Sequence, residues 1–174
     1  MSWGFRMNSQ KGWKIETFGN IVSKEKHSFK RGPFGGSLTK SMFVPEGYKV
    51  YEQKHAINNN FDLGTYYIDE KKFKEMSAFK VRPGDFIISC SGTIGKMAEI
   101  PADAKEGIIN QALLKITIDE RKVLKKYFCY LWESNLIQKY LSKVSRGVAI
   151  KNVPSVKDLK KINIPIPNSL KEQQ

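Results

Sequence analysis

The sequence contains few of the residues that build metal centres and disulfide frameworks. Its 174 residues include two cysteines, Cys90 and Cys129, and two histidines, His27 and His55. Two cysteines exclude a disulfide framework and a four-cysteine zinc site. No hydrophobic run approaches the ~18 residues that a membrane-spanning helix needs, and no signal-peptide pattern is present. We therefore expect a cytoplasmic protein with reduced thiols and no membrane partner.

Acidic residues are scarce, because 17 Asp and Glu stand against 30 Lys and Arg and leave a formal net charge of +13. The excess is uneven: +6 in residues 1–50, 0 in 51–100, +4 in 101–150 and +3 in 151–174. This distribution predicts a basic face and a polyanionic partner; the alternative is a solvated surface that serves solubility. Nucleic acid is favoured over a membrane, because no single helix combines a Lys-rich face with a broad apolar one.

Short strands and helices alternate in the sequence without a regular β-α-β rhythm. Apolar alternation predicts strands at 48–51, 55–57, 86–90, 97–100, within 108–118, and at 162–167. Helices are expected at 16–22, at 69–78 and as a pair within 123–145, divided near Ser134. Residues 23–41, rich in basic residues and glycine, predict a long exposed loop. We therefore expect an α+β fold: one globular domain with a mixed, twisted β-sheet and flanking helices.

The segment from Gly92 to Lys96 resembles a phosphate-binding loop but lacks the full pattern. The Walker motif needs a glycine where Cys90 stands and a Ser or Thr where Met97 stands, so nucleotide binding is not expected. Gly92 and Gly95 also match the GxxG loop with which KH domains clamp a nucleic-acid backbone. An RNA- or single-strand-binding module built on 92–95 is therefore an alternative function. The plainer interpretation is a tight turn between two strands.

A second glycine-rich segment, Gly32 to Ser37, is framed by basic residues. Glycines let a backbone approach a phosphate closely, and Lys and Arg supply the charge. The alternative is a surface connection in which Phe34 packs into the core.

Catalytic patterns are missing from the sequence. No carboxylates are spaced as a nuclease metal site requires, and no methyltransferase glycine motif is found. A stand-alone hydrolase that uses His55 with nearby carboxylates is kept as a third hypothesis.

Five stretches together are specific for one family. They are GPFGGSL at 32–38, VRPGDFIISCSGTIGKMAEIP at 81–101, EGIINQALLKI at 106–116, SRGVAIKNVPSVKDLKKINIPIP at 145–167 and LKEQ at 170–173. The sequence resembles the target recognition domain of type I restriction–modification specificity (S) subunits. The resemblance implies a lead-in segment at 1–12, a DNA target recognition domain at 13–167 and the start of a truncated spacer helix at 168–174.

What the resemblance implies is a non-catalytic module that reads one half of a bipartite double-stranded DNA target. Methyltransferase (M) subunits that use S-adenosylmethionine and restriction (R) subunits driven by ATP with Mg²⁺ would supply the chemistry, so no cofactor or metal is expected in this chain. A second recognition domain normally follows the spacer helix. We expect this chain to be a fragment, or a half-length subunit that pairs with a copy of itself.

The expected DNA contacts are basic or hydrogen-bonding side chains in four segments. Gln53 suits adenine and Arg31 suits guanine, because their paired donors and acceptors fit those base edges, whereas lysines more often bind phosphate. The predicted DNA-binding residues are Lys30, Arg31, Ser37, Thr39, Lys40, Gln53, Lys54, His55, Thr93, Lys96, Arg146 and Lys151.

Overall fold

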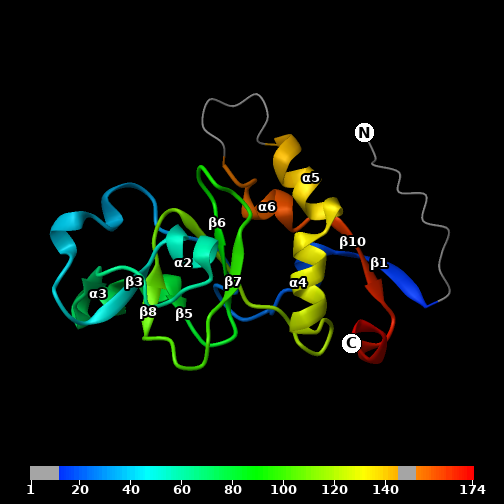
Figure 1. Cartoon of the computed structure of the whole chain (residues 1–174), viewed down its shortest axis with the longest axis horizontal. Helices are drawn as coiled ribbons and strands as arrows, with labels where there is room; N and C mark the ends of the chain where they lie inside the picture. The colour runs from blue at the N-terminus through cyan, green and yellow to red at the C-terminus, as the bar shows by residue number, and fades with distance from the viewer. Residues whose placement is uncertain (1–11, 145–151) are drawn as a thin grey trace.

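The computed structural model describes residues 12–144 and 152–174 of the chain. Their strands form three small β-sheets, one of four strands at the centre, a second of four strands on one side and a two-stranded ribbon on the other (Figure 1). Helices lie between the central sheet and the ribbon. The α+β expectation is confirmed, although the strands are divided among three sheets.

The central sheet is antiparallel, with the strand order β2 (Phe29–Arg31), β9 (Leu113–Ile116), β6 (Phe86–Ser89) and β7 (Met97–Glu99). The turn before β6 is the one that Arg82-Pro83-Gly84-Asp85 predicts, because Gly84 has φ 87° and Asp85 N donates to Arg82 O at 3.0 Å. Both faces of β6 are buried, since Ile87 and Ile88 point in opposite directions and each has no exposed surface. The central sheet therefore separates two hydrophobic cores.

The second sheet is mixed, with the order β4 (Tyr67–Ile68), β3 (Tyr48–Tyr51), β8 (Gly107–Ile109) and β5 (Lys80–Val81). Strands β3 and β8 run parallel, and the other pairs are antiparallel. Two short helices, α2 (Gln53–Asn58) and α3 (Glu70–Glu75), follow β3 and β4. Asp69 caps α3 as expected, since its side chain accepts from the backbone N of Lys72 at 2.7 Å.

On the other face of the central sheet lie α4 (Lys125–Glu133) and α5 (Asn135–Val144), the expected helix pair. Their apolar residues Phe128, Trp132 and Ile137 are fully buried in one core with Phe86 and Leu114. The same core is closed by α1 (Phe18–Ile21), α6 (Val156–Leu159) and the ribbon, in which β1 (Trp13–Thr17) pairs antiparallel with β10 (Asn163–Pro167).

Three sequence-based expectations about local structure are wrong. Residues 55–57 belong to helix α2 instead of a strand, because three residues are too few to distinguish a helical from an alternating pattern. Residues 23–41 are not one loop, since β2 lies within them and pairs with β9. The start of the predicted helix at 16–22 is strand β1 up to Thr17.

Short 3₁₀ turns complete the described chain: η1 (Gly35–Ser37), η2 (Lys40–Met42), η3 (Ser77–Phe79) and η4 (Leu170–Gln173). The last one is held firmly, because the buried Gln173 side chain accepts from Leu124 N at 2.8 Å and donates to Lys122 O at 3.0 Å. Gln173 thus joins the end of the described chain to the start of α4.

Candidate nucleic-acid interface

Arg31 lies where three distant segments of the chain meet. Its Nη2 donates to Asn152 Oδ1 at 2.8 Å, and its Nε lies 3.5 Å from the backbone oxygen of Gln111. The next residue, Gly32, donates from its backbone N to Leu113 O at 2.9 Å. A Cβ atom at Gly32 would lie 1.8 Å from Asn110 O, so only glycine permits this approach of the two backbones. Arg31 is therefore held at the end of β2 by its neighbours.

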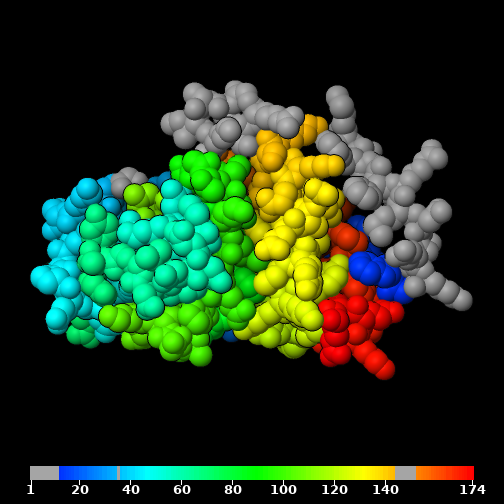
Figure 2. All heavy atoms as spheres, viewed as in Figure 1, coloured from blue at the N-terminus to red at the C-terminus, as the bar shows by residue number. Residues whose placement is uncertain are grey.

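The turn between β6 and β7 is fixed beside this junction. Ser91 forms an isolated β-bridge with Asn152, and Val153 N donates to Cys90 O at 3.1 Å. The far side of the turn packs against the helices, since the Trp132 indole N–H donates to Gly95 O at 2.8 Å. The turn is drawn in green beside α5 and α6 (Figure 1), and its surface adjoins that of the yellow and orange helices (Figure 2).

We call this surface the basic edge; it comprises Arg31–Gly32, Ser91–Lys96, Asn110–Ala112, Asn152 and the neighbouring helix α5. Parts of four acid-free stretches of sequence meet there, and the stretches run over 26–45, 86–98, 107–118 and 134–157. Together they carry 11 Lys and Arg in 69 residues, whereas the other 105 residues carry 19 Lys and Arg against 17 Asp and Glu. Of the net charge of +13, +11 therefore belongs to these four stretches of sequence, and Arg31 and Lys96 are the members that lie at the junction itself.

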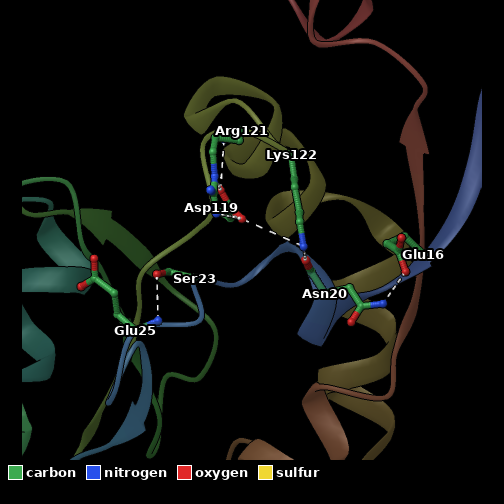
Figure 3. A network of polar contacts seen from close by, with 7 residues as sticks. All are labelled: Glu16, Asn20, Ser23, Glu25, Asp119, Arg121 and Lys122. Carbon is green, nitrogen blue, oxygen red and sulfur yellow. Dashed lines mark hydrogen bonds and ion pairs between the residues drawn. The ribbon is translucent and has the colours of Figure 1, made fainter.

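Several basic residues elsewhere have acidic partners. At the connection between β9 and α4, both guanidinium nitrogens Nε and Nη2 of Arg121 bind Asp119 at 2.8 and 2.9 Å (Figure 3). This hydrogen bonding lowers the pKa of Asp119. Lys122 also lies near Asp119 and donates to Asn20 O at 2.8 Å. Lys125 in α4 pairs with Glu99 at 2.7 Å. These charges are balanced by acidic neighbours.

Three of the predicted DNA contacts, Arg31, Thr93 and Lys96, are brought together at the basic edge. Thr93 and Lys96 are exposed, and Arg31 is half-buried. Lys30 points to the opposite face of the central sheet from Arg31, because neighbours on a strand alternate, and its Nζ lies 5.2 Å from the centre of the Phe79 ring. Whether any of them touches DNA stays a prediction.

Ser37, Thr39 and Lys40 are exposed, but they lie farther along the chain, where Leu38 packs into the core of the second sheet. Phe34 does not pack into the core as the alternative interpretation held, since 70% of its surface is exposed. Arg146 and Lys151 lie outside the described residues.

The predicted contacts in α2 lie on a helix that packs against β6 and β7 of the central sheet. Lys54 is paired with Glu52 at 2.6 Å, so its charge is compensated. Gln53 is half-buried, and its Oε1 accepts no hydrogen bond from the described residues. His55 as a DNA contact is wrong, because its ring has no exposed surface. The same burial denies His55 the solvent access that the hydrolase hypothesis requires.

Both ring nitrogens of His55 have structural partners. Nδ1 lies 2.8 Å from the backbone N of Glu52, and Nε2 lies 2.6 Å from Leu63 O. A carbonyl oxygen only accepts, so Nε2 carries the proton and Nδ1 accepts from Glu52. The ring therefore ties the start of α2 to the loop that follows it.

The basic edge also includes side chains that sequence reasoning missed, among them Gln111, Lys139 and Asn152. Lys139 is exposed on α5, whose Leu141 and Gln138 border Gly95. One signal in the sequence would have indicated them: the long stretches without an acidic residue, above all 134–157. Only the fold shows that these stretches meet.

Within residues 12–144 and 152–174, no group of three His, Cys, Asp or Glu side chains lies close enough to hold a metal ion. No helix in this part of the chain is long and apolar enough to cross a membrane. Burial raises the pKa of the Cys90 thiol to about 12, so this side chain is a core residue instead of a nucleophile.

The sequence of residues 32–174 matches the family described as type I restriction modification DNA specificity domain. The chain belongs to this family. None of the curated proteins compared with the chain matches it.

Solved structures of type I systems share the fold of this specificity domain at 19% sequence identity. A structure described as the basis of complex assembly and conformational transition of the type I R-M system has a TM-score of 0.66, with 94% of this chain and 36% of that chain covered. The S subunit from M. genitalium has a TM-score of 0.57, with 97% and 38% covered. The HsdS subunit from Thermoanaerobacter tengcongensis has a TM-score of 0.64, with 98% and 37% covered. The specificity domain thus spans little more than a third of the length of these chains.

Proposed function

We propose that this specificity domain reads a short double-stranded DNA sequence, one half of a bipartite target, at the basic edge. The observation that carries the proposal is the meeting of four acid-free segments around Arg31, Lys96 and Asn152. Such a surface attracts phosphates, and its exposed Lys and hydrogen-bonding side chains resemble those of DNA-binding surfaces. Family membership supports DNA as the polyanion.

The domain contributes recognition, and bond-making and bond-breaking take place in partner proteins. We infer methyltransferase subunits that use S-adenosylmethionine, and restriction subunits driven by ATP with Mg²⁺, as these partners. A second recognition domain, or a second copy of this one, would read the other half of the target.

Within the basic edge, phosphate contacts and base contacts belong to different side chains. Lys96 and Lys139 are exposed point charges suited to phosphate. The hydrogen bond to Asn152 orients the Arg31 guanidinium. When this bond opens, the fork of the guanidinium can bind guanine O6 and N7. We therefore assign sequence discrimination to Arg31 and general affinity to the lysines.

The test measures duplex binding by the purified chain. Fluorescence anisotropy reports the binding, with a labelled pool of random 30-base-pair duplexes as the probe. If roughly six phosphates are contacted, log K falls with a slope near −5 against log salt concentration. Replacing Lys96 and Lys139 together by Ala should make that slope shallower by about 2, to about −3, for every sequence alike. The matched control removes two exposed lysines away from the basic edge, Lys71 and Lys171, and should change the slope far less.

Arg31→Lys keeps the charge but removes the planar fork, so it should relax sequence preference more than it weakens average binding. A flat salt response, or equal effects of both double-lysine variants, would contradict the assignment. Competition by RNA or single-stranded DNA in preference to duplex would favour the alternative module built on the 92–95 turn instead.

A further inference from the structure

One aromatic side chain beside the basic edge is held in water. Phe34 has 70% of its surface exposed, which makes it the most exposed large hydrophobic residue in the described chain. Its neighbour Pro33 is buried, as is Leu38 a few residues later. Buried residues therefore lie on both sides of Phe34 in the chain, while its aromatic ring is exposed to solvent.

The backbone around Phe34 is anchored. Before it, Gly32 is wedged against Asn110 O and hydrogen-bonded to Leu113 O at 2.9 Å. After it, the Ser37 hydroxyl donates to the backbone oxygen of Phe34 at 2.9 Å. Three residues of chain span at most about 11 Å between Cα atoms, so Phe34 lies within about 11 Å of Arg31. A DNA duplex held at Arg31 therefore comes within reach of the Phe34 ring.

The electrostatic surroundings of Phe34 differ from those of the other exposed apolar side chains. Phe34 belongs to residues 26–45, which contain four Lys and Arg and no acidic residue. Tyr130, with 64% exposed, shares α4 with Glu133, and Ile15, with 55% exposed, precedes Glu16. An exposed ring in a stretch that carries Lys and Arg but no acidic residue suits a partner that combines phosphates with flat apolar surfaces, and stacked base pairs are such a partner.

We propose that Phe34 inserts its ring between two neighbouring base pairs of the bound duplex and partly unstacks them. This inference rests on the proposed function, because it needs a duplex at the basic edge. The ring contributes apolar stacking and a local kink, and the surrounding basic residues hold the phosphates on either side. Phe34 would then make the readout depend on how easily the local base step opens, in addition to contacts with base edges.

The experiment first enriches a preferred sequence, by selection of 30-base-pair duplexes with a randomised centre on the purified chain. The enriched duplex is then synthesised with 2-aminopurine at each adenine position in turn, because the fluorescence of this base rises when it unstacks. At saturating protein, the fluorescence should rise at one or two adjacent positions. Phe34→Ala should remove the rise even at saturation, and it should weaken binding about tenfold. Phe34→Leu should keep part of both effects, since leucine also serves as a wedge.

Two comparisons make the result decisive. The salt dependence of Phe34→Ala should equal that of the unsubstituted chain, because no phosphate contact is lost. The control Tyr130→Ala removes an aromatic ring of similar exposure and should change neither affinity nor fluorescence. If Phe34→Ala binds as the unsubstituted chain does, or if no 2-aminopurine position responds, the wedge is wrong while the proposed function stands. Failure of the unsubstituted chain to bind any duplex would overturn both.

Discussion

The replacement of His55 tests the structure most directly, because the sequence suggests a DNA contact there and the structure shows a buried link. His55→Ala removes two buried hydrogen bonds and leaves the N–H of Glu52 and the carbonyl of Leu63 without a partner. Each unpaired group costs about 1–2 kcal/mol, and the space left by the ring adds about 1 kcal/mol or more. We expect a loss of about 3–5 kcal/mol in the free energy of unfolding, which lowers the melting temperature by roughly 10 °C.

A second variant separates the hydrogen bonds from the volume. His55→Phe fills the space but cannot bind either backbone group, so it should lose less stability than His55→Ala and more than the surface control Lys54→Ala. Lys54→Ala should lower the free energy of unfolding by at most about 1 kcal/mol, because the Lys54–Glu52 ion pair is partly exposed to solvent. The measurements are urea unfolding followed by circular dichroism, and duplex binding at 15 °C, where the variants are still folded.

Duplex affinity of the folded His55 variants should equal that of the unsubstituted chain. If His55→Ala unfolds at the same urea concentration as the unsubstituted chain and loses DNA binding, the reasoning from burial is refuted and the sequence-based assignment is restored.

Three further predictions concern other buried groups. Gln173→Ala should lower the free energy of unfolding in urea by about 2 kcal/mol, because it leaves the N–H of Leu124 unpaired. The stability of Gln173→Glu should lie between those of the unsubstituted chain and Gln173→Ala, since glutamate keeps the acceptor. A maleimide at pH 8 should label Cys129 in the folded chain and Cys90 only after unfolding, as mass spectrometry would show, because Cys90 has no exposed surface and its pKa is raised to about 12. Burial lowers the pKa of Lys115 below 10.5, so between the lowered value and 10.5 the unfolded chain binds more protons and stability rises with pH. The unfolding free energy of the unsubstituted chain should therefore rise relative to that of Lys115→Met as the pH goes from 7 towards 10.5. A difference between the two unfolding free energies that stays constant with pH would contradict the burial of this charge.

Local patterns in the sequence predict a large part of the fold. The pair α4 and α5, the division between them, the cap at Asp69 and the turn at Gly84 all depend on contacts between residues a few positions apart. Where a segment is very short, local patterns fail, as at 55–57, because three residues fit a helix and a strand equally well. The same limit hid β2, whose three residues are ordered by pairing with β9, more than 80 residues later.

For the candidate site, the sequence by itself determined the charge, the acid-free stretches and the glycine at position 32 that allows the close backbone approach to Asn110. It also determined membership of the specificity-domain family. The tertiary structure alone decided which of these stretches meet. The hydrogen bond from Arg31 to Asn152 joins residues 121 positions apart, and the burial of His55 depends on a loop that closes over it. Such contacts follow from how sheets and helices pack together, and no local pattern of residues encodes them.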